Sequence, residues 1–91
     1  MNNTIVLIPH FNNLKGLYKS ISSIGLNECV DILIVDDGSS SKIIEKEVNA
    51  KFKAQGILFI EYLESNLGIE HALNKGLEII SGGSFSNFKN D

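Results

Sequence analysis

Two adjacent acids, Asp36 and Asp37, come directly after an apolar segment and are followed by Gly38 and Ser39. Neighbouring side chains at the end of a strand point to opposite sides of it. We therefore expect one carboxylate to face a ligand while the other holds the turn. The alternative is purely structural, with both acids and the serines that follow capping the next helix.

Two further loops place polar and aromatic residues after apolar segments. One contains Pro9, His10, Phe11 and Asn12, and the other is segment 64–68, Glu-Ser-Asn-Leu-Gly. Each precedes a predicted helix, whose free N–H groups and dipole attract anions, so a phosphate-bearing ligand is favoured even without arginine. Phe11 is equally suited to stack on a base or to join the core. His10 fits a hydrogen-bonded loop residue better than a catalyst.

Three apolar runs must position these loops. Residues 5–8, 32–35 and 57–60 are uninterrupted and rich in β-branched side chains, which predicts buried strands. Helical spacing of apolar residues predicts a helix after each of them. The order β-α-β-α-β-α predicts right-handed crossovers and an α/β fold, with a parallel sheet in three layers. Ligands of such sheets bind beyond the carboxyl ends of the strands, where the three loops should meet.

Local signals predict where the first elements begin and end. Pro9 lacks a backbone N–H and should end the first strand. Asn12 or Asn13 should cap the first helix, and Gly25 should stop it. The three serines at 39–41 should cap the second helix.

The third helix carries residues that are unusual inside a helix. Asn66 should cap it, and the glycines at 82–83 should stop it. Asn74 and Gly76 lie within it, and both residue types cost helix stability. Their presence indicates a close approach to a strand or to a ligand.

Composition limits the classes of function. The 91 residues form one small domain with a net charge of −3, and all eight basic residues are lysines. Without a basic patch, binding to nucleic acid lacks its main driving force. Cys29 is the single cysteine, so we expect a small buried hydrophobe and neither a disulfide nor a metal cluster. The glycine patterns of dinucleotide sites and P-loops are absent, which disfavours both.

The apolar runs are also too short to cross a membrane, since a bilayer requires about 20 apolar residues. No basic segment precedes the first run, as it would in a signal peptide. The sequence therefore predicts no transmembrane segment and a cytoplasmic location, either free or peripheral to the membrane.

Three motifs together resemble those of the family-2 glycosyltransferases. Residues 8–13, Ile-Pro-His-Phe-Asn-Asn, resemble the family's I-P-[TAH]-[YF]-N segment. Residues 35–40, Val-Asp-Asp-Gly-Ser-Ser, are similar to its V-D-D-G-S-[TS] turn, and residues 66–76 match its N-x-G-x-x-x-A-x-N-x-G helix. The three occur in the family's order and cover nearly the whole chain.

The resemblance implies the nucleotide-binding part of a GT-A fold. Such enzymes transfer a sugar from a nucleotide-diphosphate donor to an acceptor hydroxyl, and the acceptor here would be a saccharide or a lipid-linked molecule of envelope polysaccharide biosynthesis. The resemblance places Asp37 against the base or ribose and gives Asp36 a more structural role. The residues that it implies at the donor site are Pro9, His10, Phe11, Asn12, Asp36, Asp37, Gly38, Asn66, Gly68, Asn74 and Lys75.

The sequence also departs from the family's pattern. Family members hold Mg²⁺ or Mn²⁺ on the diphosphate with a D-x-D motif beyond the third helix. The candidates here are Asp91, as the first acid of that motif, or Asn90 in its place. The acceptor-binding part and a general base have no counterpart in the sequence, so no catalytic residue is assigned. We expect residues 1–91 to be a single truncated donor-binding domain without transfer activity of its own.

Two other classes stay open. The paired acids also resemble those of a phosphoacceptor receiver domain, but the later acceptor acid and lysine are missing. A non-catalytic nucleotide-binding or assembly module would keep the pocket without the chemistry. An uncovered strand at the edge of the sheet would further allow a homo-oligomer.

Overall fold

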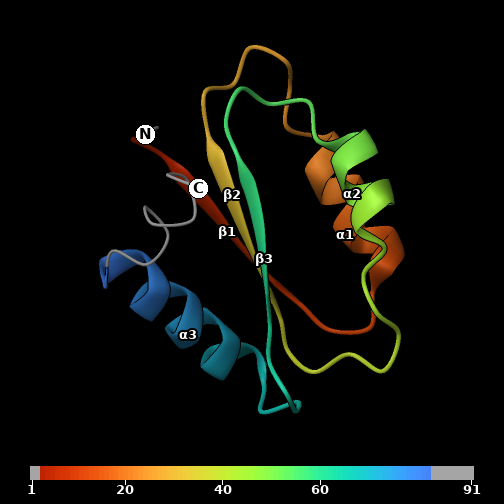
Figure 1. Cartoon of the computed structure of the whole chain (residues 1–91), viewed down its shortest axis with the longest axis vertical. Helices are drawn as coiled ribbons and strands as arrows, with labels where there is room; N and C mark the ends of the chain where they lie inside the picture. Colours follow the sequence, from red (N-terminus) through yellow and green to blue (C-terminus); the bar gives the residue numbers. More distant parts are fainter. Residues whose placement is uncertain (1–2, 83–91) are drawn as a thin grey trace.

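The computed structural model describes residues 3–82, and these form one parallel sheet with helices on both faces (Figure 1). The strands are β1 (Ile5–His10), β2 (Asp31–Asp36) and β3 (Leu58–Tyr62), in the order β1-β2-β3. Both pairings are parallel. The predicted α/β class, the strand order along the chain and the three layers are confirmed.

The helices divide between the two faces of the sheet. Helices α1 (Leu14–Ser22) and α2 (Glu45–Lys51) lie on one side, and α3 (Ile69–Ser81) lies on the other (Figure 1). Alternation along β2 separates the core in the same way. The side chains of Ile32 and Ile34 pack towards α1 and α2. Those of Leu33 and Val35 point to the opposite face and pack towards α3.

Among the described strands, β1 lies at an edge of the sheet, and it continues through Pro9, although this proline was expected to end it. The carbonyl oxygens of Thr4 and His10 accept hydrogen bonds from the β2 side, from the N–H groups of Asp31 and Asp37. The backbone N–H and C=O groups of the even-numbered residues of β1 therefore point to β2, and the backbone of Pro9 points to the outer edge. Its missing N–H costs no bond between β1 and β2, which is why proline is tolerated there.

Two helix boundaries differ from the prediction. Helix α1 begins after Asn13, whose side chain caps it as expected, but it ends at Ser22 and not at Gly25. Helix α2 begins only at Glu45, with Ile44 at the N-cap position and no side-chain cap. The serines at 39–41 do not cap it, because they bond elsewhere.

Other local expectations were also wrong. Cys29 is exposed in the loop before β2 and is not a core residue. The N-cap residue of α3 is Gly68, which makes no side-chain cap, so Asn66 is not the cap. The predicted stop is confirmed by Gly82, the C-cap residue of α3.

Gly76 shows why a helix interior contains glycine here. It is buried on α3 against β1, and a Cβ at this position would press on Leu7, with Leu7 Cδ2 at 2.9 Å. The predicted close approach of helix to strand is thereby confirmed for Gly76. Asn74 is exposed and takes no part in it.

Candidate functional site

Asp36 joins the first two loops at the carboxyl end of the sheet. Its side chain is buried, and its Oδ1 lies 2.8 Å from Nδ1 of His10. The hydroxyl of Ser39 donates to the same oxygen at 2.6 Å, and the Ser39 N–H donates to Oδ2 at 3.0 Å. One carboxylate therefore fixes the turn that follows β2 and the residue that ends β1.

Asp37 joins the second loop to the third. Its Oδ1 accepts the N–H of Leu67 at 3.1 Å, and its Oδ2 accepts the N–H of Gly68 at 2.8 Å. Its own N–H donates to the carbonyl of His10 at 2.8 Å. The two acids serve different loops, as strand alternation predicts. Both of them hold turns, so Asp37 borders the site with its oxygens already engaged.

Asn12 adds a second link between the first two loops. Its backbone has a φ of 47°, a left-handed conformation that asparagine adopts more readily than most residues. Its N–H donates to the Ser39 hydroxyl at 2.8 Å, and its Oδ1 accepts the N–H of Ser40 at 3.0 Å. The backbone N–H of Ser41 also donates to this oxygen, at 3.4 Å. These contacts occupy the serines that the sequence had suggested as a helix cap.

Two glycines of the loops have backbone conformations that other residues rarely adopt, and Gly38 also lets the second and third loops approach one another. Gly38 has a φ of 72°, and a Cβ there would lie 2.6 Å from the backbone nitrogen of Asn66. Gly68 has a φ of 103° and a ψ of 160°, a region that is essentially restricted to glycine. Any side chain at Gly38 would force the second and third loops apart.

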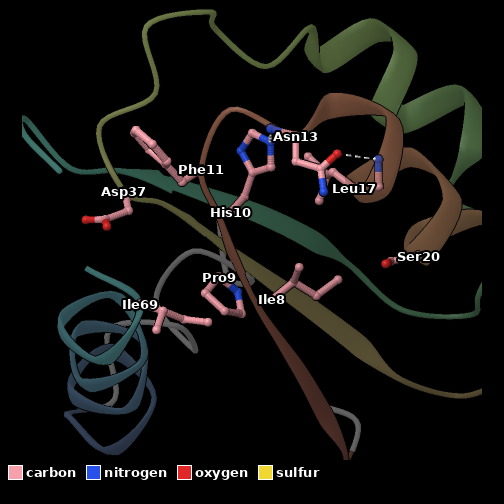
Figure 2. A pocket seen from close by; sticks show the side chains of 10 residues that line it. Ile8, Pro9, His10, Phe11, Asn13, Leu17, Ser20, Asp37 and Ile69 are labelled. Atoms are coloured by element: carbon pink, nitrogen blue, oxygen red, sulfur yellow. Dashed lines mark hydrogen bonds between the residues drawn. The ribbon is translucent and has the colours of Figure 1, made fainter. Parts of the chain in front are cut away.

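A cavity of about 360 Å³ opens between the end of β1, the first turns of α1 and the start of α3 (Figure 2). It is lined by Ile8, Pro9, His10, Phe11, Asn13, Gly16, Leu17, Ser20, Asp37 and Ile69. Phe11 is 44% exposed, whereas Asp37 is only 3% exposed. The cavity therefore combines an accessible aromatic face with a buried carboxylate.

The predicted site residues separate into three groups. Four of them line the cavity: Pro9, His10, Phe11 and Asp37. Five belong to the hydrogen-bonded loops beside it: Asn12, Asp36, Gly38, Asn66 and Gly68. Asn74 and Lys75 lie farther along α3, and neither lines the cavity. The Lys75 ammonium lies 3.7 Å from the Glu78 carboxylate on the same helix.

Several residues of the site were not predicted as site residues. Gly16 lines the cavity because it lies beside the Asn13 side chain, which accepts its N–H at 3.0 Å. The helix-cap pattern that predicted Asn13 was the available signal for this pair. Ile69 lines the far side and is 67% exposed, and only its place directly after Asn-Leu-Gly pointed to it.

A second cavity, of about 410 Å³, lies on the α2 side of the sheet, and Tyr62 and Glu45 are among its lining residues. The Tyr62 hydroxyl donates to Glu45 Oε2 at 3.0 Å. Burial raises the pKa of Tyr62 to about 12, with further contributions from the hydrogen bond to Glu45 and from the negative charges of Glu45 and Asp36. The phenol is therefore a neutral donor at any physiological pH.

The described residues do not fit a divalent cation. Within residues 3–82, no group of three or more His, Cys, Asp or Glu side chains is placed to hold a metal ion. The oxygens of Asp36 and Asp37 already accept hydrogen bonds from protein groups. Asp91, the expected ligand, lies outside the described residues.

The same part of the chain contains no helix with the length and apolar character needed to cross a bilayer. The longest helix is α3, with 13 residues.

Comparison with known families identifies the class. The family described as Glycosyl transferase family 2 matches residues 5–85, which covers all six elements of the fold. The chain belongs to this family, and its three-stranded βαβαβα arrangement is that of the N-terminal part of a GT-A fold. The resemblance of the three motifs is thereby confirmed, and the receiver-type alternative falls away. No curated protein and no solved structure matches the chain.

Proposed function

We propose that this domain binds the nucleotide portion of a nucleoside-diphosphate sugar and forms the donor site of a glycosyltransferase. The observation that supports this best is the cavity at the carboxyl end of β1, which Phe11 and Asp37 both border (Figure 2). Ligands of open parallel sheets bind in this position. The family supplies the reaction class, transfer of a sugar to an acceptor.

Each part of a nucleotide has a suitable counterpart around the cavity. The exposed ring of Phe11 offers a flat apolar face on which a base can stack. Helix α3 begins beside the cavity at Ile69, and its N-cap Gly68 provides no side-chain cap. The helix dipole favours negative charge at this end of α3, where the Asp37 carboxylate already accepts the N–H groups of Leu67 and Gly68, and a diphosphate would have to use the N–H groups that follow Gly68.

For the complete reaction, we propose a hexose donor and a saccharide or lipid-linked acceptor, in the synthesis of envelope polysaccharides on the cytoplasmic side of the membrane. These finer points follow from the motif resemblance, and the family match supports the sugar-transfer reaction itself. Mg²⁺ or Mn²⁺ belongs to the same proposal, with Asp91 as a candidate ligand. The described residues receive the role of donor binding and no catalytic step.

The test is a titration of the 91-residue chain with UDP and then with GDP, each with and without Mg²⁺. We expect one of the two to shift the backbone amide signals of Phe11, Asp37 and Gly68 in a ¹⁵N-HSQC spectrum. Calorimetry would give the dissociation constant. A well-dispersed spectrum that responds to neither nucleotide would refute donor binding.

Phe11→Ala gives the first testable prediction. Loss of base stacking should weaken nucleotide binding by roughly 5- to 160-fold, since stacking contributes about 1–3 kcal/mol per base. Leu26→Ala is the matched control, because Leu26 is also an exposed hydrophobic side chain but lies outside the cavity. Equal affinities of the two variants would show that Phe11 does not contact the base.

A nucleotide-binding module without transfer remains the second candidate. Both acids that join the loops are engaged in hydrogen bonds, which leaves neither as an obvious general base. Nucleotide binding that is indifferent to Mg²⁺, with no hydrolysis or transfer of a bound nucleotide sugar, would favour this candidate.

A further inference from the structure

His10 is buried between two partners that restrict its chemistry. The residue is 5% exposed, and its Nδ1 lies 2.8 Å from Asp36 Oδ1. On the other side of the ring, the backbone N–H of Asn13 points at Nε2 at a distance of 3.0 Å. Both ring nitrogens therefore have a protein partner.

These two partners determine where the ring proton is. A backbone N–H can only donate, so Nε2 must present its lone pair to Asn13. An ionised Asp36 can only accept, so Nδ1 must carry the hydrogen. The contacts select the neutral imidazole with its proton on Nδ1. In this form neither nitrogen is available to take a proton from a substrate.

The bonds of His10 connect the sheet to the first turn of α1. Asn13, which donates to the His10 ring, also caps α1 through the Gly16 N–H. The carbonyl of His10 accepts the Asp37 N–H, and Asn12 is bonded to the serines of the second loop. Phe11 thus lies between neighbours that are fixed on both sides. Figure 2 shows the His10 ring close to Asn13, beside the start of α1.

We infer that His10 is a positioning residue for the nucleotide site: through its Nδ1–H tautomer it ties Asp36 to the start of α1 and so sets the position of Phe11. This rests on the proposed donor-binding function. His10 contributes no contact with the phosphates and no acid–base step. Its effect on binding passes through the backbone of residues 11–13.

The tautomer can be tested in the unmodified chain. Long-range ¹H–¹⁵N spectra of the ring should show a protonated Nδ1 and a non-protonated Nε2 at neutral pH. A proton on Nε2, or a doubly protonated ring, would overturn the assignment. This measurement needs no variant and no nucleotide.

Two substitutions test the consequence for binding. His10→Gln keeps one donor and one acceptor at the end of the side chain, whereas His10→Phe keeps a flat ring with neither. We expect His10→Phe to weaken nucleotide binding at least 10-fold and to shift the amide signals of Phe11 and Asn13 in the free protein. His10→Gln should recover most of the affinity. A merely space-filling role would predict the opposite ranking.

The outcomes separate the two proposals. If the unmodified chain binds UDP or GDP and His10→Phe binds it equally tightly, the positioning role is wrong and donor binding stands. If the unmodified chain binds neither nucleotide, donor binding fails and the positioning role fails with it. Should His10→Phe not fold, the ring spectra and the affinity of His10→Gln decide.

Discussion

At the scale of single residues, the site is organised by two buried carboxylates that accept hydrogen bonds in different directions. Asp36 holds the first and second loops, and Asp37 holds the second and third. A buried donor left without its acceptor costs about 1–3 kcal/mol. Each acid is therefore important for loop geometry whether or not it touches the ligand.

Asp37→Asn should show this cost directly. The amide keeps one acceptor oxygen, so either the Leu67 N–H loses its acceptor or the Gly68 N–H keeps only its bond to Asn66 Oδ1, and the free energy of unfolding should fall by about 1–3 kcal/mol. Urea denaturation measures the loss, and amide exchange at Leu67 and Gly68 localises it. Glu64→Gln is the control, because it makes the same chemical change at an exposed position of the third loop. Equal stability of both variants would contradict the role given to Asp37.

Tyr62 makes stability depend on alkaline pH. Its pKa is raised from 10.0 to about 12 in the folded chain, first by burial and then by Glu45, so the folded state favours the protonated phenol. The resulting stabilisation is fully present below pH 10 and is lost as the pH rises through about 12.

Tyrosinate absorbance should therefore show a transition near pH 12 that Tyr62→Phe removes. The unfolding midpoint of Tyr62→Phe should also decline less steeply above pH 10 than that of the unmodified chain. Ionisation of Tyr62 near pH 10 would contradict the effect of burial on its pKa.

At the scale of elements, α3 packs closely against β1. Gly76 faces Leu7, and a methyl group there would displace the Leu7 side chain. Replacing glycine by alanine in a helix gains about 1 kcal/mol, but overpacking a core costs about 1–3 kcal/mol. The packing term should win, because Leu7 belongs to the cluster that joins α3 to the sheet.

Gly76→Ala is thus expected to lower the free energy of unfolding by about 1 kcal/mol, despite its better helix propensity. Gly25→Ala provides the comparison, since a Cβ at Gly25 meets no atom within 4 Å. Chemical denaturation of both variants gives the two values. A stabilised Gly76→Ala would show that Leu7 rotates away at little cost.

The sequence predicts the elements themselves better than their boundaries. The six elements followed from apolar runs and helical spacing, because these patterns record which faces are buried. The start of α2 could not be predicted in this way, because residues 39–41 form hydrogen bonds with Asp36 and Asn12 and do not cap the helix. Contacts between loops that are distant in sequence leave no local pattern. Pro9 was misplaced for a similar reason, because its tolerance depends on which side of β1 faces β2.

The candidate site was predicted less completely than the fold. Motifs identified the three loops and most of their residues, including Phe11 and Asp37. They could not show that the oxygens of Asp37 would be engaged by Leu67 and Gly68, because that depends on the path of a third loop. Asn74 entered the prediction through motif spacing, but its position along α3 turns it to solvent.

At the scale of the whole molecule, the two faces of the sheet carry different numbers of helices, and the cavity lies between the two helical layers. Helices α1 and α2 cover one face of the sheet and α3 covers the other (Figure 1). The cavity lies at the end of β1, with α1 on one side and α3 on the other (Figure 2). Residues from both layers therefore reach one ligand, and neither layer could form this cavity alone.

The outward orientation of Pro9 also bears on how copies of the molecule behave towards one another. Within residues 3–82, the outer edge of β1 has backbone donors at Ile5 and Leu7, but at Pro9 the row has none. A neighbouring strand that added to this edge would lose a rung of its ladder beside the cavity. One residue thus keeps the ligand end of the strand unsuited to fibre-like stacking, while its ring forms part of the cavity wall.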